Sequence, residues 1–264
     1  MHLSLKQLVK QSLIRFDISV TRYSYLQQLQ KDSSARQFID LLLELPVRNR
    51  MKLLNLMRHS RSQLGQDLFV LSELDFKTGG YFVDFGATNG VNQSNTCLLE
   101  KEFGWRGIVA EPARRWHKDL KSNRDCLIET ACIWSESNLT LTFNETHTGE
   151  FSTIDSYSSS DHNCQLRKNG ERYDISTISL EDMLDKYSAP RKIDYLSLDT
   201  EGSEFEILRK FNFDKYQFGV ITCEHNFTPQ REKIFSLLTQ NGYIRKYKGV
   251  SSFDDWYVNA GSTD

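Results

Sequence analysis

Five side chains that could exchange protons or bind a cation gather at the ends of two predicted strands in the second half of the chain. The strands are predicted over residues 193–199 and 218–224, and the five side chains are Asp199, Glu201, Glu204, Glu224 and His225. Because the carboxyl ends of neighbouring strands meet at one edge of an open α/β sheet, we expect these residues to lie together. They could remove the proton of a substrate hydroxyl. Alternatively, Asp199, Glu224 and His225 could hold a divalent metal ion.

Structural roles compete with these chemical ones. His225 is our first choice of base because an imidazole titrates closest to neutral pH, but it could equally be a satisfied surface residue. The two glutamates of the turn could be ordinary charges at a helix start. Ser203 could cap that helix with Glu206 reaching back to it, which would leave Glu204 free. Asp199 ends an apolar strand, where a carboxylate needs a partner, so it is the hardest to assign to structure alone.

A second group of residues lies earlier, where an apolar run over residues 81–85 gives way to a glycine-containing turn. Gly86 and Gly90 lack a β-carbon, so the turn could adopt positive φ and a ligand could approach its backbone. Glu111 ends the next predicted strand, where a carboxylate can accept hydrogen bonds from both hydroxyls of a ribose. The alternatives are a tight turn beside a buried strand and, for Glu111, a helix-start charge next to Pro112.

The residues of this turn favour a methyl donor over a dinucleotide. A pyrophosphate is usually cradled by more glycine, and Ala87 stands where a middle glycine would be. Asp84, just before the turn, suits a cationic amino group better than a phosphate. S-adenosylmethionine has an amino group and a ribose but no phosphate, so we favour methyl transfer over hydride transfer with NAD.

Strand patterns alternate with helix patterns from Tyr81 onward, which predicts an α/β sheet. Core strands are predicted over residues 82–85, 107–111, 126–134, 193–199, 218–224, 243–247 and 253–258, with added strands over 139–143 and 177–180. The polar stretch 145–170 is too long for an ordinary connection. We therefore expect it to be a functional loop or a mobile lid.

Residues 1–60 are predicted to be helical, from apolar residues at three- and four-residue spacing. They could form a cap on the main domain, a surface for a partner or a phosphorylated substrate, or a basic segment attracted to an anionic membrane. Residues 61–264 are expected to form the cofactor-binding domain. At its start, Asp67 could lie over the cofactor or stand at a helix N-terminus, which the sequence slightly favours.

Composition argues against several classes of protein. A net charge of −2 without a basic stripe gives no reason to expect nucleic acid as a partner. The five cysteines form no CxxC pair, so neither a disulfide framework nor a zinc site is expected and a cytoplasmic location fits best. No apolar run approaches the roughly 20 residues needed to cross a bilayer, and we find no signal peptide.

Taken together, these segments resemble the FkbM family of S-adenosylmethionine-dependent methyltransferases. The stretches that carry the resemblance are residues 62–67, 82–90, 94–96, 99–100, 104–107, 111–112, 196–204 and 224–226. The resemblance implies a class I methyltransferase fold, a Rossmann-like sheet of seven strands with helices on both faces. It also implies O-methylation of a hydroxyl on a sugar, a polysaccharide or a related natural product.

The resemblance also assigns residues to the cofactor. It implies that the methionine part is held by Asp84, Gly86, Ala87 and Gly90, that Glu111 binds the ribose, and that Ser94 and Asn95 line the same pocket. Asp199 would lie beside the transferred methyl. Residues 130–132 lack the aspartate that often binds adenine in other methyltransferases. The competing hypothesis is a non-enzymatic module that kept the fold and binds a partner or a membrane through its N-terminal helices.

Overall fold

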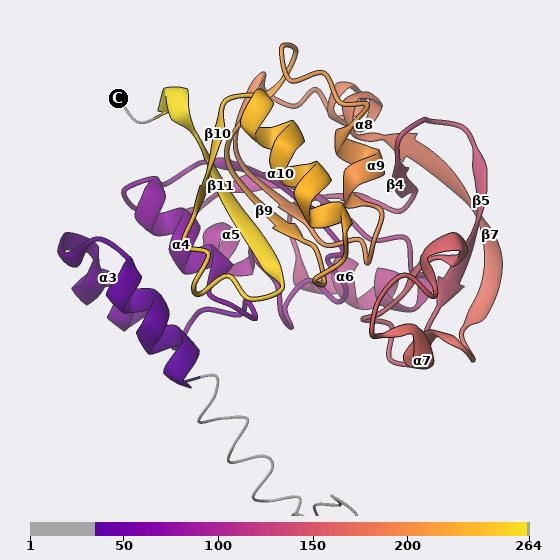
Figure 1. Cartoon of the computed structure of the whole chain (residues 1–264), viewed down its shortest axis with the longest axis horizontal. Coiled ribbons are helices and arrows are strands. Elements are labelled where there is room, and N and C mark those ends of the chain that lie inside the picture. The colour runs from indigo at the N-terminus through magenta and orange to yellow at the C-terminus, as the bar shows by residue number, and fades with distance from the viewer. Residues whose placement is uncertain (1–34, 263–264) are drawn as a thin grey trace, which may run out of the picture. The chain divides into compact units, whose positions relative to one another are not determined.

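The structure, a computed structural model, describes residues 35–262 of the chain (Figure 1). The chain divides into two units, Met1–Asp40 and Leu41–Asp264, and the first is described only over residues 35–40, which are helical. The helices expected before residue 35 lie outside the described residues. None of the described helices is long and apolar enough to span a membrane.

The second unit is built on a seven-stranded sheet with the order β10-β11-β9-β8-β1-β2-β3. Strands β3, β2, β1, β8 and β9 run parallel, whereas β11 runs antiparallel to both of its neighbours. The predicted core strands are thus confirmed, except that only residues 127–129 of the strand expected over 126–134 belong to this sheet. Their bounds are β1 (Tyr81–Phe85), β2 (Arg106–Ala110), β3 (Leu127–Glu129), β8 (Lys192–Leu198), β9 (Gln217–Glu224), β10 (Tyr243–Lys246) and β11 (Asp254–Asn259).

Helices cover both faces of this sheet, as expected, because its central strands are apolar on both sides (Figure 1). On one face, α8, α9 and α10 pack onto a core that includes Val83, Leu196 and Ile221. On the other face, Phe69 of α4 stacks on Trp256 of β11 at 4.7 Å between ring centroids. The bounds are α4 (Gln66–Glu73), α5 (Cys97–Phe103), α6 (His117–Asn123), α8 (Leu180–Lys186), α9 (Glu204–Leu208) and α10 (Gln230–Gln240).

Helix boundaries follow the sequence signals closely. A helix ends before Pro46, and η1 (Val47–Asn49) and α3 (Arg50–Leu56) follow it. The Ser179 hydroxyl accepts the N–H of Asp182 and caps α8, as its capping sequence predicts. Helix α5 begins only at Cys97, after irregular backbone in which Gln93 forms an isolated bridge with Ser62.

A smaller sheet with the order β4-β7-β5-β6 lies beside the main one, toward the right of Figure 1. Here one prediction is wrong, because the single strand expected over residues 126–134 is two strands. Glu129 turns the chain by accepting the N–H groups of Thr130 and Ala131, so the residues after the turn pair with β7 instead. The strands are β4 (Cys132–Trp134), β5 (Thr140–Glu145), β6 (Thr153–Ile154) and β7 (Glu171–Ser179).

The polar stretch over residues 145–170 is more ordered than expected. It contains β6, η3 (Asp155–Tyr157) and α7 (Cys164–Arg167). Thr153, Ile154 and Arg167 are buried, so this insertion packs against the ends of the main sheet instead of forming an open loop.

Candidate active site

A cavity of about 360 Å³ opens at the carboxyl ends of the parallel strands, beside β1 and β8. The strand order reverses between these two strands, which is where open α/β sheets bind their ligands. Nine of the predicted site residues line the cavity: Asp84, Gly86, Ala87, Ser94, Asn95, Glu111, Asp199, Glu201 and Glu224. The other four, Asp67, Gly90, Glu204 and His225, do not line it.

The glycines of the turn after β1 have a different role from the one expected. Both have positive φ, 76° at Gly86 and 81° at Gly90. A β-carbon on Gly86 would lie 2.0 Å from the carbonyl oxygen of Asp199, and one on Gly90 would meet Arg124 and Leu120. Glycine is therefore needed at both positions because other parts of the protein pack directly against them. The close approach of a ligand is not the reason for these glycines.

Asp84 is buried at the end of β1, where the positive charge of Arg124 supports it through Thr96. Its carboxylate accepts a hydrogen bond from the Thr96 hydroxyl at 2.6 Å, and the Arg124 guanidinium donates to the same hydroxyl at 3.0 Å. Burial raises the pKa of Asp84, while Thr96 and the Arg124 charge oppose this shift. Sequence reasoning missed Arg124, because nothing in the sequence shows that it contacts the distant turn.

Glu111 is buried after β2 and is held by main-chain N–H groups. Its two oxygens accept the N–H groups of Thr88 at 2.7 Å and Ala113 at 2.8 Å. Burial raises the pKa of Glu111 to about 7. A carboxylate has about four lone-pair positions, so these bonds leave acceptor capacity for the two hydroxyls of a ribose.

Three carboxylates face one another on the other side of the cavity. Asp199, Glu201 and Glu224 each place an oxygen within 4.8 Å of the others. The pKa values of Asp199 and Glu224 are both raised well above the usual range. Burial is the larger cause, and repulsion from neighbouring carboxylates is the smaller one. Protonation of either carboxyl group relieves the repulsion between them, so the two groups titrate as a pair.

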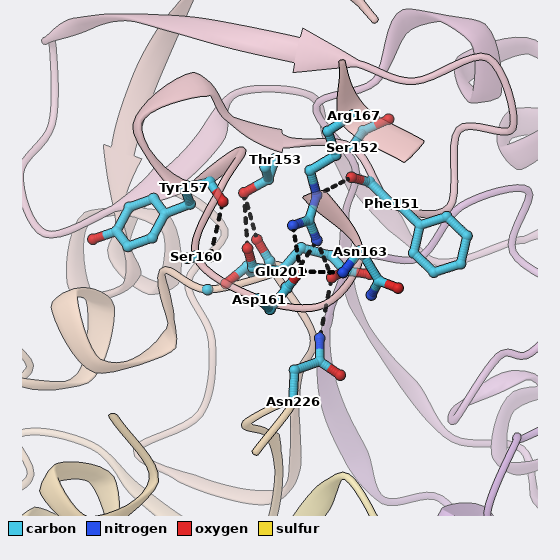
Figure 2. Close-up of polar contacts among 12 residues, drawn as sticks. Phe151, Ser152, Thr153, Tyr157, Ser160, Asp161, Asn163, Arg167, Glu201 and Asn226 are labelled. Atoms are coloured by element: carbon cyan, nitrogen blue, oxygen red, sulfur yellow. Dashed lines mark hydrogen bonds and ion pairs between the residues drawn. The ribbon is translucent and has the colours of Figure 1, made fainter. Parts of the chain in front are cut away.

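Arg167 ties the insertion to this group of acids (Figure 2). Its guanidinium is fully buried, pairs with both oxygens of Asp161 at 2.7 and 3.0 Å, and donates to Glu201 at 2.6 Å. Asn226, which follows β9, donates to the same oxygen of Glu201 at 3.2 Å. Burial raises the pKa of Glu201 to about 8, against the opposing charge of Arg167. The sequence predicted a functional role for the insertion but did not single out Arg167 or Asn226.

The roles expected for two glutamates in α9 are exchanged. Glu204, not Glu206, closes the helix start, by accepting the N–H groups of Thr200 at 2.8 Å and Gly202 at 3.1 Å. Glu206 instead forms an ion pair with Arg209 on the helix surface. Glu204 is therefore a structural residue and we withdraw it as a candidate base.

His225 is on the wrong side of the chain to act as the base or as a metal ligand. Side chains alternate along an extended chain, so Glu224 points to the cavity and His225 points away from it. The buried ring accepts the N–H of Phe227 on Nδ1 at 3.0 Å, and its Nε2 lies 3.8 Å from Asp255. Burial lowers the pKa of this imidazole.

Asp67 has the second of its two predicted roles. It lies in the first turn of α4 and is fully buried. It accepts hydrogen bonds from the hydroxyls of Ser60 at 2.7 Å and Ser62 at 2.6 Å, and from the N–H of Leu68. Asp67 thus holds residues 60–62 against the start of α4, and it does not line the cavity.

Unusual backbone conformations gather around the cavity. Five lining residues other than glycine have positive φ: Thr88, Gln93, Glu201, Asn226 and Phe227. Such conformations are costly and concentrate at functional sites. The lining also has an apolar region formed by Pro112, Cys132, Ile133, Phe143 and Ile154, which offers a surface for a flat ring where the adenine-binding aspartate is missing.

The sheet order, with β11 antiparallel to its neighbours, and a cavity at the carboxyl ends of the parallel strands are those of the class I methyltransferase fold. The model of the methyltransferase FkbM domain matches residues 84–254, more than half of the chain. The chain therefore belongs to the FkbM methyltransferase family.

Solved structures of other methyltransferases are distantly similar. Precorrin-6y C5,15-methyltransferase from Geobacter metallireducens is 12% identical, with 73% of this chain and 85% of that one covered and a TM-score of 0.38. A human methyltransferase 10 domain containing protein is 15% identical, with 74% and 79% covered and a TM-score of 0.37. No curated protein matches the sequence significantly.

Proposed function

We propose that the protein transfers a methyl group from S-adenosylmethionine to a hydroxyl of a sugar, a polysaccharide or a related natural product. The observation that carries the proposal is the division of the cavity. We call the side formed by Asp84 and Glu111 the donor half. The side formed by Asp199, Glu201 and Glu224 is the acceptor half.

The donor half fits the methyl donor by charge and by hydrogen bonding. Asp84 can pair with its amino group, and Glu111 keeps acceptor capacity for its ribose hydroxyls. The apolar region that begins at Pro112 offers a surface to its adenine. When bound, this donor supplies a methyl group that is already electrophilic, so the protein has to align the acceptor oxygen and remove its proton.

The acceptor half can take that proton. Asp199 and Glu224 lie close together at the cavity, and the carboxylate form of either can accept a hydrogen bond, and then the proton, from the substrate hydroxyl. Arg167 fixes the position of Glu201 beside them. The same three carboxylates could instead hold a divalent cation through oxygen ligands and lower the pKa of the hydroxyl directly.

The charge of the lining argues for an uncharged acceptor. Among the described residues, the lining carries six acids and neither lysine nor arginine. A phosphate-rich acceptor such as RNA would be repelled at the reacting end, whereas a neutral hydroxyl would not. A cytoplasmic location stays a prediction from the sequence.

Calorimetry with S-adenosylhomocysteine, followed by methyl transfer to a panel of glycans with and without added divalent ions, tests the proposal. We expect binding, and transfer to at least one neutral glycan. Asp84→Asn should weaken binding, and the exposed Asp214→Asn, a matched control, should not. Unchanged binding by Asp84→Asn would refute the assignment of the donor half. Binding without transfer to any acceptor would favour the non-enzymatic module instead.

A further inference from the structure

The segment from Leu41 to Arg61 presents apolar side chains on the outside of the domain. Its inner side packs through Leu41, Leu45 and Leu53, which are at most 1% exposed. Asn49 adds hydrogen bonds to the carbonyl and hydroxyl of Ser72 on α4, at 3.1 and 3.0 Å. These contacts hold the segment to the domain, so its outer side is not needed for packing.

The outer side carries an apolar stripe, which we define as Leu43, Val47, Met51 and Leu54. These side chains are 61%, 74%, 70% and 52% exposed. Val47, Met51 and Leu54 recur at spacings of four and three residues along the consecutive helical elements η1 and α3, which places them on one side of that run, whereas Leu43 belongs to the helix that ends before Pro46. Single exposed apolar residues are ordinary, but four within residues 43–54 indicate an interaction surface.

The charges around the apolar stripe are almost all positive. Residues 41–61 contain five basic side chains and one acid, Glu44, giving a net charge of +4 in a chain whose total is −2. The basic side chains are Arg48, Arg50, Lys52, Arg58 and Arg61. None of the five forms an ion pair with a carboxylate within residues 35–262, whereas Lys101, Lys186 and Lys215 elsewhere all do.

A basic hollow lies between the residues that follow α3 and helix α5. Arg58, Arg61 and Lys101 line this depression of about 480 Å³, together with His59, the Glu102 that contacts it, and the apolar residues Val91, Cys97 and Leu98. Lys101 is already paired with Asp125, so Arg58 and Arg61 supply its available positive charge. A hollow with this charge suits a phosphate group.

We propose that the apolar stripe and the basic hollow dock the enzyme onto an anionic lipid surface. The stripe would enter the boundary between headgroups and acyl chains, while the basic side chains contact lipid phosphates. Charge selects this occupant over a second copy of the chain, because a two-fold interface would place two surfaces of net charge +4 against each other. Docking in this way would hold the enzyme near acceptors that are attached to, or assembled on, a membrane.

Sedimentation of the full chain with vesicles tests the proposal. We expect binding to phosphatidylcholine vesicles that contain phosphatidylglycerol, little binding to phosphatidylcholine alone, and release by high salt. Met51→Gln together with Leu54→Gln should weaken binding about a hundredfold, by removing two inserted apolar side chains. Arg58→Ala together with Arg61→Ala should weaken it about 25-fold.

Each control removes one exposed side chain of the same kind as those removed in the test variants. Ile244→Gln removes an apolar side chain that is 53% exposed on β10, and Lys118→Ala removes an exposed cation on α6. Both should bind vesicles within about twofold of the unchanged chain. Absence of binding to the anionic vesicles, or equal losses in the control and test variants, would overturn the proposal.

Two further measurements identify other occupants of the stripe. If Met51→Gln with Leu54→Gln turned a dimer into a monomer in the absence of lipid, the surface would belong to a second copy. If Met51 in the free monomer were protected from hydroxyl-radical labelling, another part of this chain would cover it. Either result would overturn lipid docking. Rapid labelling of Met51 that is lost on vesicle binding would support it.

Discussion

In the donor half of the cavity, Asp84 and Glu111 are held by a hydroxyl and main-chain N–H groups that all come from residues 88–113. In the acceptor half, Asp199, Glu201 and Glu224 face one another, and the compensating charge comes from Arg167 in the insertion. The donor half is thus built within one stretch of the chain, residues 84–124, which includes the Arg124 that supports Thr96. The acceptor half depends on the packing of distant segments, so mutations should separate the two halves by what they damage.

The largest effect is expected from Arg167→Met. Removing the guanidinium leaves Asp161 and Glu201 buried without their shared cation, which should lower the free energy of unfolding by about 3–5 kcal/mol. Urea unfolding measures this change. Arg172→Met is the control, because Arg172 pairs with Asp155 at the surface and should cost less than about 1 kcal/mol. A small loss at Arg167 would show that the acceptor half does not need the insertion.

The next largest effect is expected on catalysis alone. Asp199→Asn removes one member of the carboxyl pair and should lower kcat about 100- to 1,000-fold, as loss of a general base does. Because Asp199 belongs to the acceptor half, the Kd for S-adenosylhomocysteine should stay within about threefold. An equal loss in cofactor affinity and in kcat would show that Asp199 also supports donor binding, so that the two halves do not act separately.

Glu111→Gln should act on the donor half instead. Two charge-assisted hydrogen bonds to ribose become weaker, so affinity for S-adenosylhomocysteine should fall about tenfold at pH 8. Burial raises the pKa of Glu111 to about 7, so the unchanged protein should bind more tightly as pH rises through 7 and the carboxylate forms. Calorimetry from pH 6 to 8 should show this rise, and Glu111→Gln should show a flat profile.

The smallest effect is expected from His225→Asn. The side-chain oxygen of asparagine can accept the N–H of Phe227 as Nδ1 does, and His225 does not reach the cavity. We therefore expect kcat within about threefold of the unchanged enzyme. A loss of a hundredfold or more, with the melting temperature preserved, would restore His225 as the base.

The sequence predicted the main sheet, and the placing of Asp84 and Glu111 at its strand ends, because both depend on short-range patterns. Apolar runs, glycine turns and strand-end acids lie within a few residues of each other, as at Asp84 and Glu111. The errors arise where contacts join distant parts of the chain, or where the alternation of side chains along a strand decides which residue faces the cavity. His225 and Glu224 are neighbours in sequence, but the two sides of a strand send one of them away from the cavity.

Competition between similar residues accounts for the remaining errors. Glu204 and Glu206 both follow Ser203 closely enough to close the helix start, and only the local geometry assigns that role to Glu204. Arg167 could not be found as the partner of Glu201 because 34 residues separate them along the chain. A buried ion pair between remote segments leaves no periodic signal in the sequence.

Gly86 sets the spacing between the two halves of the cavity. Its missing β-carbon lets the backbone after β1 touch the carbonyl of Asp199, so the turn that holds the donor rests directly on the residue that faces the acceptor. If the two halves bind donor and acceptor as proposed, the distance between the two substrates is set by main-chain contact and not by flexible side chains. Any side chain at Gly86 would act as a wedge between this turn and Asp199, and would move the two halves of the cavity apart.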